Sequence, residues 1–405
     1  MEDVRRLLGI KIESTYWDEA YAKAKKDPQV PEWMSQEYIR SLHDDYGLFP
    51  TYIDYVLTTA KQVSQKPELC LLAKTLAYIL STKKSFSDAF TEFELPEAPD
   101  GEASIGYDCF AILPIVANLR PTWDELASRG MPEEFITSSL IVIEWLMSGA
   151  FKEAGKPCFS EKYFRLYSVA IYMKYFILNR LRFEICPKAD VPAGIFRNKD
   201  GKYCILMGNT YLHKSGHILG SFGCSDAVDS YYADFVETED AYEGYAVDET
   251  TRLAQNVRTV LPKKEWEPVF VPGDDVIRVH IPMGGKLKKE ACEKSYALAK
   301  ELLPRCFPEY DFKCFLTGCW MLSPELKDVL PLESNIISFQ SKYEAFPLKS
   351  NAEDAFMYVF GIEGARLEEL DYESLPESNS LMKGIKKKTL EKNFIYEFSG
   401  FIPWR

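Results

Sequence analysis

The spacing of apolar residues predicts a helical first part of the chain. Apolar residues recur at helical spacing in four stretches, at 52–60, 69–80, 110–119 and 136–147. Breaks that contain proline and glycine separate several of these stretches. Thr122, followed three residues later by Glu125, has the form of a capping box at the start of a helix. We therefore expect a helical domain over residues 1–155, in which no obvious chemistry stands out.

From about residue 159 the pattern changes to one that includes strands. A long amphipathic helix over 160–179 is expected to lead into a strand at 181–185. An Asp200-Gly201 turn between two short apolar runs predicts a β-hairpin. Further short strands are expected at 231–235, 242–247 and 276–281.

The segment after residue 275 predicts parallel strands. A strand at 276–281 runs into a tight glycine turn, and a helix over 288–303 follows. A second strand at 313–322 and a helix at 324–345 complete a βαβα order, which requires parallel neighbouring strands. Together with the antiparallel hairpin, this order predicts a mixed sheet with helices on both faces. The fold class is thus α+β, with the sheet domain over residues 156–405.

The composition of the chain disfavours some functional classes of protein. A chain of 405 residues, 46% of them hydrophobic, is large enough for two full cores. The net charge of −13 disfavours a nucleic-acid-binding protein, which needs a basic face. The most apolar stretch of the first half, 135–151, holds Glu144 and is shorter than a membrane span. We expect no nucleic-acid partner and no membrane insertion.

The ten cysteines are scattered, without a Cys-x-x-Cys pair. This distribution is typical of buried thiols in a reducing compartment, and the first residues lack the apolar run of a signal peptide. The expected location is therefore the cytoplasm. His213 and His217 have a spacing seen in metal-binding helices, but Gly216 disfavours a helix and no third ligand is evident, so no metal is expected.

Several ordered blocks of sequence resemble a known family. The blocks are 279–285, 319–322, 334–340 and 375–381, with earlier pieces at 242–244 and 266–268. They resemble the GNAT-like C-terminal domain of a bacterial acyltransferase family, and the helical first part is similar to its N-acyltransferase N-terminal domain. The resemblance covers most of the chain. It implies transfer of an acyl group, with acetyl expected, from acyl-coenzyme A to an amine of an unidentified acceptor.

The resemblance also implies where coenzyme A binds. In this fold the turn between a central strand and the following helix offers backbone N–H groups to the pyrophosphate. The corresponding residues are Met283, Gly284, Gly285, Lys286 and Leu287. Glycines allow close approach of an anion, and the lysine adds positive charge. The turn is shorter than the usual GNAT signature, so a plain strand-to-helix connection stays open as an alternative.

Three residues are candidates for catalysis. His280 ends the strand that leads into the expected cleft, and histidine ordinarily titrates near neutrality, which suits a general base. Tyr343 is the candidate acid, because GNAT enzymes often carry a tyrosine in the helix that follows. Cys319 is a candidate nucleophile if it lies beside His280. For each residue a structural role is the alternative, namely a hydrogen-bonded histidine, a core tyrosine and a buried thiol.

Two other functions remain open at this point. One is a non-catalytic protein that keeps the fold and binds a small ligand or a partner. The other is cysteine-based chemistry at Cys319. A cleft between the strands that end near His280 and Trp320 would favour acyl transfer, whereas a cleft filled by side chains would favour the non-catalytic alternative.

Overall fold

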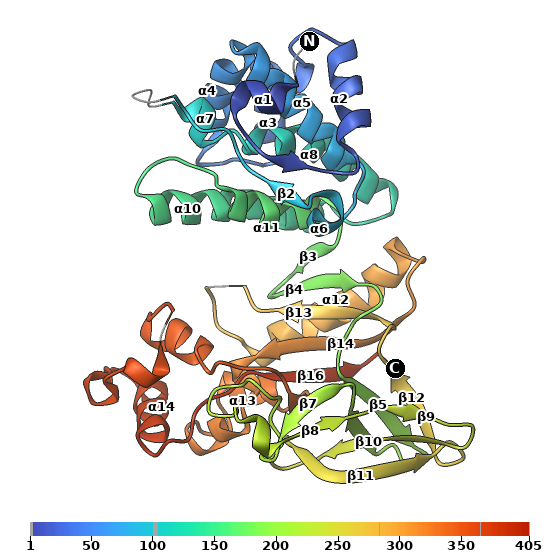
Figure 1. The fold of residues 1–405 in the computed structure, drawn as a ribbon. Helices are drawn as coiled ribbons and strands as arrows, with labels where there is room; N and C mark the ends of the chain where they lie inside the picture. The colour runs from blue at the N-terminus through green and yellow to red at the C-terminus, as the bar shows by residue number, and fades with distance from the viewer. Residues whose placement is uncertain (1–2, 100–103, 283, 365, 405) are drawn as a thin grey trace. The chain divides into compact units, whose positions relative to one another are not determined.

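The computed structural model describes residues 3–99, 104–282, 284–364 and 366–404. It contains two compact units, one of residues 1–178 with 305–307, and one of residues 179–304 with 308–405 (Figure 1). The class is α+β, as predicted, with the first unit mainly helical and the second built on one mixed and one antiparallel sheet. The division falls after Leu178, later than the predicted boundary after residue 155.

The first unit is a bundle of helices with three short strands. The helices are α1 (Val4–Leu8), α2 (Trp17–Lys26), α3 (Gln36–Asp44), α4 (Ile53–Ser64), α5 (Pro67–Ser81), α6 (Phe86–Ala89), α7 (Ile105–Asp108), α8 (Ile112–Ser128), α9 (Glu133–Leu140), α10 (Val142–Ala154) and α11 (Glu161–Ile171). The strands are β1 (Ile12–Glu13), β2 (Glu92–Phe93) and β3 (Tyr175–Leu178). α8 runs unbroken through Thr122, so the predicted capping box does not start a helix there.

Helix α11 explains why the first unit extends past residue 155. The Tyr167 hydroxyl donates to the Leu140 carbonyl at 2.7 Å. The Phe164 ring stacks on Phe93 with the ring centres 5.2 Å apart. The helix ends at Ile171, not at 179 as predicted, and Met173 then adopts a left-handed φ of 57° before β3 begins. The amphipathic face of α11 therefore completes the helical core.

One helical stretch within the described ranges, Glu133–Ala154, is long and apolar enough to cross a membrane by length and composition. It spans 22 residues and is thus longer than the apolar stretch identified in the sequence. About 39% of its most apolar window is buried within the protein, and the buried Glu144 carboxylate accepts the Thr51 N–H at 2.6 Å. Core helices pass the same test, so this length and composition are weak evidence for a membrane span.

The second unit contains two larger sheets and a small hairpin. The strands are β4 (Leu181–Cys186), β5 (Ala193–Asn198), β6 (Tyr203–Met207), β7 (Thr210–His213), β8 (Ser230–Ala233), β9 (Val236–Glu237), β10 (Ala241–Val247), β11 (Ala254–Pro262), β12 (Trp266–Phe270), β13 (Asp275–His280), β14 (Phe312–Cys319), β15 (Glu344–Pro347) and β16 (Phe398–Pro403). The helices are α12 (Lys289–Cys306), α13 (Asn335–Gln340) and α14 (Ser380–Leu390).

The central sheet has the order β15-β16-β14-β13-β4 within this unit. β13 and β14 are parallel, as predicted, whereas β4, β16 and β15 pair antiparallel with their neighbours. The second sheet has the order β11-β10-β6-β5-β12, and β5 and β6 form the predicted hairpin. The predicted helix at 324–345 is wrong, because a 3-10 turn at Pro324–Asp328, α13 and β15 occupy that segment.

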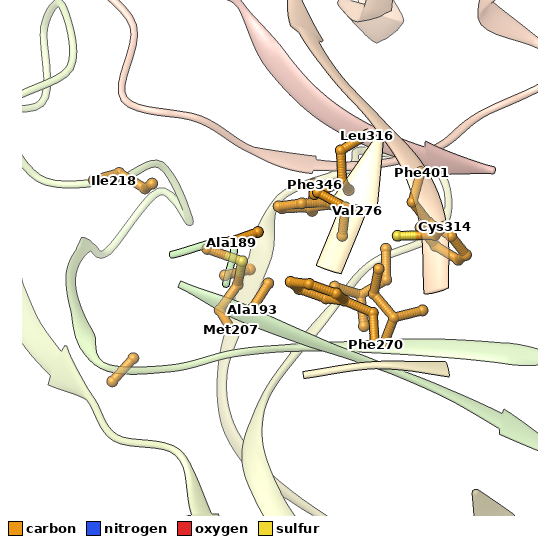
Figure 2. Close-up of a cluster of buried hydrophobic side chains, with 14 of the residues drawn as sticks. Ala189, Ala193, Met207, Ile218, Phe270, Val276, Cys314, Leu316, Phe346 and Phe401 are labelled. Atoms are coloured by element: carbon orange, nitrogen blue, oxygen red, sulfur yellow. The ribbon is translucent and has the colours of Figure 1, made fainter. Parts of the chain in front are cut away.

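Different elements cover the two faces of the central sheet. α12 lies on one face, where Tyr296 contacts Phe315 with ring centres 5.3 Å apart. The opposite face packs on the second sheet through a buried apolar cluster (Figure 2). Val276, Cys314 and Leu316 join this cluster from the central sheet, and Phe270 and Met207 join it from the second sheet. β13 is thus fixed from both sides.

His217, in the loop between β7 and β8, is expected to make stability depend on pH. Its ring lies against Tyr396 with ring centres 4.3 Å apart, and burial lowers the pKa of His217 to about 4. The unfolded chain takes up this proton near pH 6.5, so the stabilisation is complete above that pH and is lost as pH falls toward 4. The loss is up to about 3 kcal/mol.

Denaturant unfolding of wild type and His217→Phe between pH 7 and 4 measures this contribution. The phenylalanine keeps an aromatic ring against Tyr396 and cannot take up a proton. We expect the variant to lose less stability than wild type across that interval. Identical pH dependence in the two proteins would show that His217 does not contribute.

Candidate active site

The parallel strands β13 and β14 separate at their C-terminal ends. Their pairing stops at Arg278 opposite Leu316. Beyond that point each strand stays paired with its outer neighbour, β13 as far as His280 and β14 as far as Cys319. The Thr317 hydroxyl donates to the Val279 carbonyl at 2.8 Å, which replaces the missing backbone bond at the point of separation. The two central strands therefore separate into a cleft, as the family resemblance implied.

A pocket of about 320 Å³ lies at this opening. Polar residues that line it include Asp190, Arg278 and His280, and apolar residues include Phe346 and Leu348. The lining comes from the strands β13, β14, β15 and β16 and from the segments before β5 and after β15. Such a combination of apolar wall and few polar groups is typical of a small-molecule site.

His280 lies in this pocket, at the end of β13. Its side chain is half-buried, and Arg278 is on the same face, while Ile277 and Val279 point to the α12 face and are buried. His280 Nε2 is 2.8 Å from Oε2 of Glu184 on β4. Sequence analysis did not identify Glu184, because it precedes His280 by 96 residues and meets it only through strand pairing.

The candidate anion-binding turn connects β13 to α12. Gly284 and Gly285 have left-handed φ values of 78° and 69°, a conformation that favours glycine. Gly284, Gly285 and Lys286 are exposed, whereas Leu287 is buried. Met283, also predicted to bind the cofactor, lies outside the described residues. The described part of the turn is accessible and positively charged, so it fits a phosphate group.

Arg180 orders this turn, and sequence analysis missed it. Its guanidinium donates to the carbonyls of Pro282, Gly285 and Lys286, at 3.0, 3.1 and 3.3 Å. In a planar trans peptide the C=O and the following N–H point in opposite directions. The N–H groups of Lys286 and Leu287 therefore point away from Arg180. A single arginine thus holds three carbonyls of the turn on one side and leaves these two N–H groups on the other side.

Replacing Arg180 with alanine is expected to disorder this turn. Three carbonyls lose a charged donor, so amide hydrogen exchange at Lys286 and Leu287 should rise and coenzyme A should bind about 10-fold more weakly. Isothermal titration and hydrogen exchange measure the two effects. Arg197→Ala, which removes an arginine bonded to Glu267 in the second sheet, is the matched control. Unchanged exchange in Arg180→Ala would contradict the assignment.

Tyr343 does not lie on a helix. It follows α13 in the turn before β15, and its side chain is buried. Its hydroxyl is hydrogen-bonded to the hydroxyl of Tyr296 on α12, and burial raises the pKa of Tyr343 well above its usual range. Tyr343 is absent from the residues that line the pocket in the described part of the chain. Its role as an acid stays a prediction, and its surroundings are those of a core tyrosine.

Cys319 and His280 point to opposite faces of the central sheet. Ile277 is opposite Phe315 in the parallel pair, so alternation places Cys319 on the α12 face and His280 on the pocket face. Burial also raises the pKa of Cys319 to about 12, which keeps it a thiol near neutrality. The two side chains are not brought together, and the arrangement does not support a Cys319 nucleophile activated by His280.

Two carboxylates near the end of β14, Asp354 and Glu397, line a separate pocket that shares Leu348 with the pocket of His280. Burial raises the pKa of both Asp354 and Glu397. Glu397 accepts the Asp354 N–H at 3.3 Å and the Ser350 hydroxyl, so the two acids lie close together. The sequence carried no signal for this pair. No group of three or more His, Cys, Asp or Glu that could hold a metal ion occurs among the described residues.

Comparisons with known proteins agree with this architecture. Residues 176–402 match a family described as the GNAT-like C-terminal domain. Solved structures with the same fold include an acyltransferase in complex with decanoyl-CoA and teicoplanin, and the same class of protein with CoA and 10C-teicoplanin, each with a TM-score of 0.60. A mutant acyltransferase in complex with octanoyl-CoA has a TM-score of 0.59.

Each of these structures is 16% identical to this chain, and the match covers 99% of this chain and 98% of the other. At this identity the likeness shows a common fold. The search of curated proteins gave no match. The family match spans more than half of the 405 residues and includes the separated strands, the pocket and the turn before α12. The chain therefore belongs to the GNAT-like C-terminal domain family.

Proposed function

We propose that the protein transfers an acyl group from an acyl-coenzyme A to an amine. The observation that carries this proposal is the opening between β13 and β14, with an accessible glycine turn after β13 and a pocket that contains His280. Residues of this chain meet two requirements of this reaction. Backbone N–H groups of the turn can bind the phosphates of acyl-coenzyme A, and His280 can act as a base toward the acceptor amine.

Residues of this chain take distinct parts in the reaction. Gly284, Gly285, Lys286 and Leu287 would hold the pyrophosphate, and the bound thioester supplies the activated acyl group. His280 takes the proton that the attacking amine loses as the new C–N bond forms. The C–S bond of the thioester breaks, and coenzyme A leaves as a thiolate that takes this proton from the His280 imidazolium, which gives the free thiol and returns His280 to its neutral form. Asp354 and Glu397 are the alternative base.

The preferred acyl group and the acceptor can be identified by assay. Acetyl was expected from the sequence, but the fold relatives were crystallised with decanoyl-CoA and octanoyl-CoA. We propose that medium-chain donors are accepted as well as acetyl-CoA. Two of those structures also contain teicoplanin or 10C-teicoplanin, so teicoplanin belongs in the first acceptor screen.

Thermal-shift measurements with coenzyme A and with acetyl, octanoyl and decanoyl thioesters test the proposal. A donor that binds the native state raises the melting temperature, and a donor at 100 times its Kd stabilises by about 2.7 kcal/mol. Release of free thiol in the presence of an amine then reports turnover. Binding without thiol release would favour a non-catalytic ligand-binding protein, and no binding of any thioester would contradict the proposal.

We also propose that the protein works in the cytoplasm. All ten cysteines are free thiols in the structure, four of them only partly buried, which suits a reducing compartment. Cell fractionation tests this location, and recovery of the native protein outside the cytoplasm would contradict it.

A further inference from the structure

We infer that Glu184 is a positioning residue that fixes the ring orientation and the tautomer of His280, so that Nδ1 is the atom that receives the proton. This inference rests on the proposed function and adds a residue to it. It starts from one contact, the 2.8 Å separation between Glu184 Oε2 and His280 Nε2. Both side chains are partly buried, with 19% of Glu184 and 33% of His280 exposed.

The register of the sheet sets the positions of the two side chains in this contact. His280 is opposite Arg182, and Arg278 is opposite Glu184, in the antiparallel pair of β13 and β4. All four side chains therefore share one face, and His280 reaches Glu184 along the diagonal between neighbouring pairs. The backbone pairing that fixes β13 in the sheet also fixes the distance between the two side chains.

The chemistry of the two groups sets the tautomer. An ionised carboxylate only accepts hydrogen bonds, so the ring nitrogen that faces it carries a proton. A neutral imidazole has one protonated nitrogen, and with Nε2–H bonded to Glu184 the lone pair is on Nδ1. Once Nδ1 takes a proton from the acceptor, the charge of Glu184 stabilises the resulting imidazolium.

The position of Glu184 separates it from substrate. His280 lines the pocket, whereas Glu184 is absent from the lining found in the described part of the chain. Glu184 thus acts through His280 and needs no contact with the acceptor. The charged groups around His280 are Glu184 and Arg182 on β4, Arg278 on its own strand and Asp190 from the segment before β5. α12 packs on the other face of the sheet.

Nitrogen-15 NMR of the full chain reads the tautomer without any need for activity. The protein has four histidines, so the signals that vanish in His280→Gln identify this ring. In wild type we expect a single tautomer with the proton on Nε2. Glu184→Gln keeps an acceptor and should keep that tautomer, whereas Glu184→Leu should give a mixture. A proton on Nδ1 in wild type, or an unaltered ring in Glu184→Leu, would overturn the inference.

Kinetics then test the effect on the reaction. Both variants should lower kcat by about 10–100-fold, the range seen when the carboxylate partner of a functional histidine is removed, and leave the Kd of the donor unchanged. Glu267→Gln, which removes a carboxylate paired with Arg197 in the second sheet, is the matched control.

The two hypotheses fail in different ways. If wild type binds no acyl-coenzyme A and shows no turnover, the proposed function is wrong, and the NMR result still decides whether Glu184 sets the ring. If wild type is active while Glu184→Leu turns over at the wild-type rate, the proposed function stands and the positioning role of Glu184 is wrong.

Discussion

Replacing His280 with glutamine is expected to lower kcat by about 10²–10⁴-fold, the usual effect of removing a general base. The affinity for acyl-coenzyme A should stay nearly unchanged, because the donor is expected to bind at the turn after β13 and not at the ring. Glutamine can still donate to Glu184, so the cross-strand contact is kept while the basic nitrogen is lost. Initial rates with saturating donor and titration of the donor measure the two quantities.

A matched variant controls for the loss of a histidine. His213 is in the same unit, on the small hairpin, and its Nδ1 is bonded to the Ser215 hydroxyl. His213→Gln should have wild-type turnover. A His280→Gln enzyme with normal activity would assign His280 a structural role and would turn attention to Asp354 and Glu397.

The strand pattern around the site could be predicted, because it depends on residues that are close in sequence. The β-branched run at β13, the glycine turn and the amphipathic α12 specify a strand, a connection and a helix, and the parallel pairing follows from their order. The position of His280 at the end of this strand is likewise evident from the local sequence. These features need no information from distant parts of the chain.

The contacts that give the site its chemistry could not be predicted in this way. Arg180 is more than 100 residues away from the carbonyls it binds, and Glu184 meets His280 only because β4 pairs with β13. Nothing in a single sequence marks which arginine or glutamate is brought to a given strand end. Glu184 has the local pattern of an ordinary strand, and Arg180 that of the turn before it.

The errors of local prediction have tertiary causes. Residues 172–178 are apolar enough for a helix, yet Met173 turns the chain and β3 forms instead. In the segment 324–345, Pro331 interrupts the helical pattern, and the residues after α13 pair with β16 as β15. Tyr343 consequently lies in a turn rather than on a helix. Packing and strand pairing overrode the local propensity in both segments.

Gly285→Asp is expected to abolish binding of coenzyme A, with Kd rising by at least about 100-fold, equivalent to about 2.8 kcal/mol. Two effects act together. A left-handed φ of 69° is strained for a non-glycine residue by about 1–2 kcal/mol, so the turn shifts. The new carboxylate also repels the pyrophosphate, and it lies near Arg180, since a Cβ at this position would be 3.7 Å from Arg180 Nε. An ion pair there would compete with the carbonyls that Arg180 holds.

Two further variants separate these effects in the same titration. Gly285→Ala adds the strain without the charge, and among the described residues a Cβ there meets only Arg180 Nε within 4 Å, so we expect an intermediate loss of affinity. Gly201→Asp makes the same change at a left-handed glycine with open space around it, in the β5–β6 turn of the second sheet. Because that turn is in another sheet, the Gly201→Asp variant should bind acyl-coenzyme A with the affinity of wild type. Unchanged affinity in a folded Gly285→Asp protein would remove the β13–α12 turn from the donor site and would place the coenzyme A pyrophosphate elsewhere on this unit.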